Sequence, residues 1–180
     1  MAIGNDATKL FAGVITSLKI ATGTATYTTG VLQGDIIVGY TGDDVSFSST
    51  IETSDLTAGQ TITPVSTTFK SRKFQLKFSF AEYKLINFAY ALGTKAANAG
   101  LVSSDTYLSG SSDAPDTVAI QVVFENSNEA AAYNVYTLTC FSCKLSSGGT
   151  ISFTKGTQGF IEVTFDVLDN SGTPYVITKG

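Results

Sequence analysis

Phe74-Gln-Leu-Lys-Phe-Ser-Phe80 is the stretch that decides the fold class, and residues 81–92 follow it with a different pattern. In the first stretch, large apolar side chains alternate with polar ones. This period of two predicts a β-strand with one buried face. The face expected in the core carries Phe74, Leu76, Phe78 and Phe80.

At residue 81 the period changes to the three-to-four spacing of an amphipathic helix. We predict a helix over residues 81–92. Gly93 is expected to end it, because glycine adopts the left-handed conformation at helix C-termini without steric cost. The stripe expected to pack on a sheet is Leu85, Phe88, Ala89 and Leu92.

The rest of the chain predicts strands separated by turns. Strands are expected around residues 9–20, 35–40, 117–125, 133–145 and 159–168. A hairpin turn at residues 169–172 should lead into a closing strand at 175–178. Strands, one helix and further strands describe a mostly β (α+β) chain: a β-sandwich or barrel-like fold with one flanking helix. We expect one domain over residues 1–180, with an N-terminal arm at about 1–9.

A turn signal at residues 41–44 and a short alternating run at 45–48 lead into residues 49–64, which are polar and contain few bulky apolar side chains. Together these form the segment 41–64. Long segments without their own structure are uncommon in compact domains and are usually functional or disordered. We therefore interpret this segment as an interaction loop or an extended hairpin.

The composition favours strands and leaves little surface charge. Hydrophobic residues make up 43% and charged residues 14% of the chain, against a usual charged share of about 25%. Mixed surface charge normally prevents association, so this surface suits self-assembly. An ordinary Ser/Thr-rich β-sandwich fits the same composition. The net charge of −4 argues against binding nucleic-acid phosphates, which needs a basic face.

The residues needed for common catalysis are missing. The chain has no His, which removes the commonest general acid/base and metal ligand. No phosphate-binding loop or Ca²⁺ loop is present. Glu162 and Asp166 share a strand face, but an offset of four residues is too long for an acid/base pair. We therefore predict that the chain is not an enzyme and uses no cofactor and no metal.

Cys140 and Cys143 form a Cys-x-x-Cys spacing within a run that has the composition of a strand. An offset of three in a strand is expected to point the two side chains to opposite faces. The redox motif with this spacing places its cysteines at a helix N-terminus instead. We therefore expect two reduced cysteines that serve for packing.

No apolar run approaches the ~18 residues of a membrane helix. The first residues lack the basic and apolar regions of a secretory signal. We expect a protein that is made in the cytoplasm and has no membrane partner.

Several motifs occur in a characteristic order. Val38-Gly-Tyr-Thr-Gly-Asp-Asp-Val-Ser-Phe47 precedes the polar segment, and the alternating strand runs into a helix that ends Ala91-Leu-Gly93. Ile161-Glu-Val-Thr-Phe-Asp-Val-Leu168, a turn and Tyr175-Val-Ile-Thr178 close the chain. This order resembles the major tail tube proteins of long-tailed bacteriophages. The likeness covers residues 10–93 and 117–180 and is most specific at 35–65 and 74–93.

The resemblance implies a virion structural protein that forms hexameric rings, stacked into the hollow tail tube through which DNA is delivered. Its partners would be copies of itself, together with tape-measure and tail-terminator proteins. DNA would pass through the lumen without specific binding. Residues 41–64 would contact a neighbouring subunit or ring. The candidate interface residues are the acids Asp43, Asp44, Glu52 and Asp55 and the bases Lys70, Arg72 and Lys73.

Two alternatives remain open at this point. The chain could be another virion component, such as a head-decoration or tail-terminator protein, which would form trimers or a single ring but would not polymerise. It could also be a carbohydrate-binding or adhesin-like β-sandwich. That reading is weakened because the chain has no Trp to stack on a sugar.

Overall fold

The computed structural model describes residues 13–22, 27–28, 31–32, 36–37, 41, 45–56, 66–93, 115, 117–127, 134–151 and 159–180. The predicted N-terminal arm lies outside these residues. The prediction of a mostly β chain with one short helix is confirmed for the described part. The elements are β1 (Gly13–Thr22), β2 (Tyr27–Thr28), β3 (Val31–Leu32), β4 (Ile36–Ile37), β5 (Ser46–Leu56), β6 (Ser66–Phe80), α1 (Leu85–Leu92), β7 (Val118–Asn126), β8 (Val135–Ile151), β9 (Ile161–Val167) and β10 (Tyr175–Lys179).

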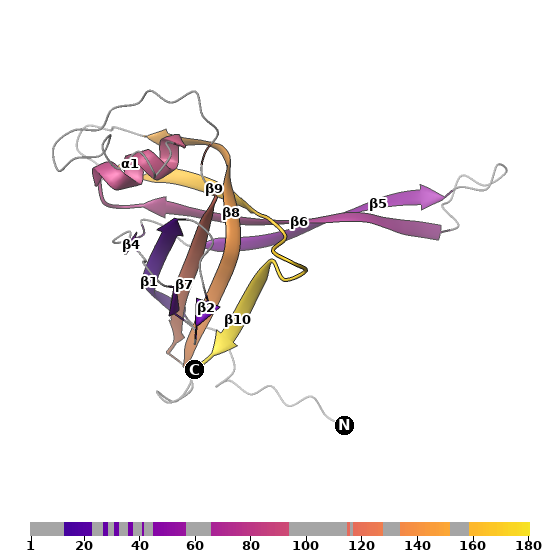
Figure 1. The fold of residues 1–180 in the computed structure, drawn as a ribbon, viewed down its shortest axis with the longest axis horizontal. Helices are drawn as coiled ribbons and strands as arrows, with labels where there is room; N and C mark the ends of the chain where they lie inside the picture. The colour runs from indigo at the N-terminus through magenta and orange to yellow at the C-terminus, as the bar shows by residue number, and fades with distance from the viewer. Residues whose placement is uncertain are drawn as a thin grey trace.

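One curled antiparallel sheet dominates the described residues (Figure 1). Its strand order is β4-β1-β7-β8-β9-β6-β5, and β10 pairs with β8 beside this path. β2 and β3 form a separate two-stranded sheet. The 17-residue strand β8 organises the large sheet. It is longer than predicted, because it continues to Ile151 instead of ending near residue 145.

The predicted apolar face of β6 is confirmed, and Ser79 on the opposite face is buried as well. Leu76, Phe78 and Phe80 are fully buried, and Phe74 is half-buried at the rim of the core. In β9 the alternate residues Ile161, Val163, Phe165 and Val167 are all buried. The rings of Phe78 and Phe165 stack across the two strands with centroids 5.7 Å apart. Burying a side chain of this size stabilises the fold by about 1.5–3 kcal/mol, so this strand pair anchors the sheet.

The helix forms, but the predicted packing stripe is confirmed only in part, since Phe88 and Ala89 pack on the core and Leu92 does not. α1 starts at Leu85, and its buried residues are Asn87, Ala89, Tyr90 and Ala91. Of the predicted stripe, only Ala89 is buried; Leu85 and Phe88 are half-buried, and Leu92 is 46% exposed.

The cause is a close approach of the helix to β8. A Cβ added at Gly149 would lie 2.8 Å from the Cβ of Ala91. The helix therefore turns its small residue, not its leucines, toward the sheet. The predicted stop is confirmed, since Gly93 has φ +73° and its N–H points back to the last helical carbonyls.

The turn at residues 169–172 forms, but the predicted hairpin does not. The N–H of Gly172 donates to both carboxylate oxygens of Asp169, at 3.0 and 3.2 Å. β10 then pairs with β8 and not with β9. Both β9 and β10 run antiparallel to β8, β9 along Cys143–Ile151 and β10 along Tyr136–Cys140. The turn is thus an excursion between two successive strands on one edge of β8, and the chain direction does not reverse.

The two cysteines do not point to opposite faces, so that prediction is wrong. Cys140 pairs with Ile120 of β7, and Cys143 pairs with Val118. Three residues of β8 therefore span only two of β7, which is a β-bulge. Since Val118 and Ile120 are two positions apart, their partners share one face, and both thiols lie in the main apolar core. The expectation that they are buried, unpaired packing residues is confirmed.

Candidate assembly surface

β5 and β6 form a long hairpin that extends beyond the rest of the sheet. Ser46 pairs with Lys77 at one end of the hairpin, and Leu56 pairs with Ser66 at the other end. Of the two interpretations of residues 41–64, the extended hairpin therefore holds for 46–56; residues 57–65 lie outside the described part. β9 supports β6 only from Phe74 to Phe80. We call the unsupported part, residues 50–56 of β5 and 66–73 of β6, the hairpin extension (Figure 1).

The hairpin extension is almost entirely exposed. Every one of its β6 residues is exposed, and so is every β5 residue except Ser54. A two-stranded ribbon alone in water is marginally stable, because it cannot bury an apolar face. β5 is also the last strand of the large sheet, so its outer edge has no partner strand among the described residues. Such an edge readily pairs with another chain.

An apolar line runs along one face of the hairpin extension. Ile51 is 51% exposed and shares the face of Phe47, because the two are four residues apart on one strand. Thr53, on the same face, is opposite Phe69, because a bulge at Lys70 shifts the register of β6. Phe69 is 59% exposed. The core face of the sheet thus continues outward with two exposed apolar side chains, Ile51 and Phe69, set among the polar Ser49, Thr53 and Arg72.

The line begins at an aromatic cluster where the hairpin meets β10. The ring of Tyr175 contacts the rings of Phe47 and Phe74 edge-on, with centroids 4.8 and 5.1 Å apart. Arg72 places its guanidinium carbon 6.0 Å from the centre of the Phe74 ring, a cation–π geometry. This cluster fixes the base of the hairpin extension to the body of the sheet.

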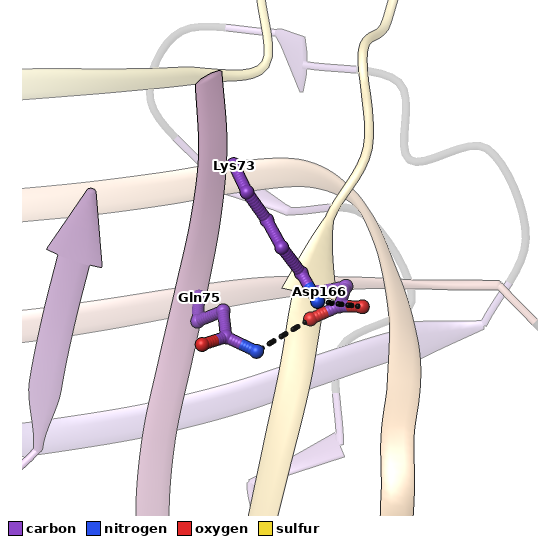
Figure 2. A network of polar contacts seen from close by, with 3 residues as sticks. All are labelled: Lys73, Gln75 and Asp166. Carbon is purple, nitrogen blue, oxygen red and sulfur yellow. Dashed lines mark hydrogen bonds and ion pairs between the residues drawn. The ribbon is translucent and has the colours of Figure 1, made fainter. Parts of the chain in front are cut away.

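The opposite face carries paired charges. Lys73 Nζ lies 3.0 Å from Asp166 Oδ2, and Gln75 Nε2 donates to Asp166 Oδ1 at 2.8 Å (Figure 2). Further along the same face, Lys77 Nζ lies 3.7 Å from Glu162 Oε2. This surface therefore presents internally neutralised charge.

Asp166 has a lowered pKa. Partial burial alone would raise the pKa of this carboxyl group. Hydrogen bonds from Gln75, Lys73 and Ser146, together with the charge of Lys73, outweigh burial and hold the pKa below its ordinary value. Asp166 is thus ionised at neutral pH and fixes the ends of two side chains of β6.

The structure brings five of the seven predicted interface residues together on the hairpin extension: Glu52, Asp55, Lys70, Arg72 and Lys73. Asp43 and Asp44 lie outside the described residues. Glu52 Oε2 accepts a hydrogen bond of 3.0 Å from Ser71 Oγ, and Asp55 is opposite Thr67. Whether these residues contact a second subunit stays a prediction.

Sequence reasoning missed the partner of Lys73. It placed Asp166 on one strand face with Glu162 but did not connect that face to β6, because the β6–β9 register joins residues about ninety positions apart. It also missed Ile51 and Phe69, which occur singly among polar residues.

Within the described residues, no group of three or more His, Cys, Asp or Glu side chains could hold a metal ion, and no helix is long and apolar enough to cross a membrane. No protein-family model and no curated protein matches the chain.

Proposed function

We propose that this chain is the tail tube subunit of a long-tailed bacteriophage, and that it assembles into hexameric rings stacked as a hollow tube for DNA delivery. The hairpin extension is the observation that carries the proposal. A ribbon with Ile51 and Phe69 exposed, and with no partner strand on its outer edge among the described residues, lacks the burial that stabilises a hairpin in isolation. Contact with a second copy supplies that burial.

The strand order supports assembly into rings or filaments. β5 ends the large sheet on one side, and β4 ends it on the other. Two different edges on one subunit allow a head-to-tail contact, in which the β5 side of one copy meets another surface of the next. A contact of this kind closes into a ring or continues as a filament. The same edges would be an aggregation hazard on a monomer.

The electrostatics support a tube that lets DNA slide. Attraction to the phosphate backbone is the main source of non-specific DNA binding. The chain has a net charge of −4, and on the outer face of β6 the cations of Lys73 and Lys77 are both paired with acids of β9. A tube lumen lined by a surface whose positive charges are neutralised in this way would bind DNA weakly.

Negative-stain electron microscopy of the purified chain across a concentration series tests the proposal. We expect rings or hollow tubes with sixfold end views at high concentration. Because tube growth can require an initiating complex, the series should be repeated with crowding agents and with pre-formed tube fragments as seeds. Monomers under all these conditions would contradict the proposal. Isolated trimers or single rings that never stack would favour a head-decoration or tail-terminator protein.

The inter-subunit role of the hairpin extension has its own readout. In assembled material, chemical crosslinking followed by mass spectrometry should join Lys70 or Lys73 to residues of a second copy. Mixing chains with and without heavy nitrogen separates crosslinks between copies from those within one copy. Crosslinks from these lysines confined to single copies would place the contact elsewhere.

A further inference from the structure

The bulge of β8 brings two buried thiols together. Cys140 and Cys143 are both fully buried in the core that β7, β8 and β9 share. Their β7 partners, Ile120 and Val118, are adjacent on one face of that strand. This arrangement is independent of the proposed function, because it depends only on the fold of one chain.

The bulge also shortens the backbone distance. In a regular strand, two Cα atoms three positions apart are separated by about 10 Å, at ~3.4 Å per residue. The β7 partners of the two cysteines are only two positions apart, which corresponds to about 7 Å. Disulfides join Cα atoms separated by roughly 4.4–6.8 Å, so the regular strand excludes the bond and the bulge brings it to the edge of the allowed range. The thiol of Cys143 donates to the carbonyl oxygen of Cys140, with Sγ 4.0 Å from that oxygen.

We propose that Cys140 and Cys143 close an intrachain disulfide when the folded chain meets a small-molecule disulfide, which makes the bulge of β8 a redox-modifiable site. One thiol loses its proton and attacks the reagent, releasing half of it as a thiol. The second thiol then attacks the mixed disulfide and releases the other half. Two protein S–H bonds are lost and one S–S bond forms, while the reagent is reduced by two electrons to two thiols.

The bond would form where β9 ends and β10 begins. Val167 is the last β9 residue opposite Cys143, and Tyr175 is the first β10 residue opposite Cys140. Between the cysteines, the carbonyl of Ser142 accepts from the N–H of Leu168, and the N–H of Phe141 donates to the carbonyl of Pro174. The disulfide-closed ring would therefore include Phe141 and Ser142, whose backbone groups bond Pro174 and Leu168 at the two ends of the segment between β9 and β10. Oxidation would thus make the β8 bulge more rigid.

The reaction should be slow at neutral pH and faster in alkali. The attacking species is a thiolate, and burial disfavours the charged form. The hydrogen bond with Cys140 and burial both raise the pKa of Cys143. Attack therefore depends on local opening of the bulge as well as on pH, and the rate should rise between pH 7 and pH 9.

The test uses the reduced full chain and oxidised glutathione, and the intact mass is measured over time. Closure of the disulfide lowers the mass by about 2 Da and removes both thiols that react with Ellman's reagent in denaturant; dithiothreitol should restore them. Retention of both thiols in the folded chain, under conditions that fully oxidise the unfolded chain, would overturn the proposal. Products that stop as glutathione adducts or chain-to-chain dimers would overturn it as well.

Two variants show that the pair is required. Cys140→Ser and Cys143→Ser each leave one thiol, so neither should lose about 2 Da, and any product should be a glutathione adduct. The measurement on the unaltered chain stands even if a variant fails to fold. Oxidation should also raise the midpoint of thermal unfolding of the unaltered chain relative to its reduced form, and it should not raise the midpoint of either variant.

Discussion

The ammonium of Lys73 on β6 lies 3.0 Å from the carboxylate of Asp166 on β9, and Gln75 holds the second oxygen of that carboxylate at 2.8 Å. The pair sits where the hairpin extension leaves the sheet. It therefore joins Lys73, the residue of the hairpin extension nearest the sheet, to the neighbouring strand, and its removal should loosen the base of the hairpin.

We expect Asp166→Asn to destabilise the subunit slightly, because the ion pair is lost while the packing is kept. Lys73 is 53% and Asp166 26% exposed, and ion pairs this accessible contribute roughly 0.2–1 kcal/mol. Urea denaturation measures the change. Glu162→Gln is the matched control, since its ion pair is longer, at 3.7 Å, and its side chain is 57% exposed. An equal loss of unfolding free energy in both variants would show that the Asp166 ion pair contributes no more than the longer and more exposed Glu162 ion pair.

The stability difference between the unaltered chain and Asp166→Asn should depend on pH. The pKa of Asp166 is lower in the folded chain than the ordinary value of about 3.9. The carboxylate therefore contributes its full stability above that ordinary value and loses it as the pH falls through the lowered pKa. Unfolding free energies measured from pH 7 downward should converge below about pH 4. A difference that stays constant to pH 2 would contradict this assignment.

Gly149→Ala should destabilise the subunit by about 1–3 kcal/mol, the usual range for overpacking. The added Cβ would lie 2.8 Å from Ala91 Cβ and 2.9 Å from two backbone oxygens, those of Ala91 and Glu162. Either the helix or the strand would have to move. Thermal unfolding measures the effect. Gly180→Ala is the control, because a Cβ there meets nothing within 4 Å; similar midpoints for both variants would rule out the tight helix contact.

If the hairpin extension is the assembly surface, Ile51→Ser and Phe69→Ser should reduce tube or ring formation at least tenfold at a fixed concentration, a loss of about 1.4 kcal/mol per contact. Both side chains are more than half exposed, so subunit stability should change by less than about 0.5 kcal/mol. Sedimentation and electron microscopy measure assembly, and chemical denaturation measures stability.

Val14→Ser is the matched control for these two variants. Val14 is 65% exposed on β1, away from the hairpin extension. Normal assembly by Ile51→Ser and Phe69→Ser would remove the hairpin from the interface, and an equal defect in Val14→Ser would show that any exposed aliphatic residue has the same effect.

The elements whose cause is local could be predicted from the amino-acid sequence. The alternation of residues 74–80, the inner face of β9, the turn at Asp169 and the stop at Gly93 all follow from the side-chain period or the backbone freedom of a few adjacent residues. Each of these features is encoded within a few adjacent residues, so it can be predicted without knowing how the rest of the chain folds.

The tertiary structure alone decided the features that depend on register between distant strands. The β8 bulge, set against β7, turned Cys140 and Cys143 to one face. The pairing of β10 with β8 replaced a hairpin. Contact with Gly149 chose the buried side of the helix, and the β6–β9 register gave Lys73 its partner. Each of these features depends on the combined energy of many contacts between residues that are far apart in the sequence. The pattern of neighbouring residues does not contain that combined energy.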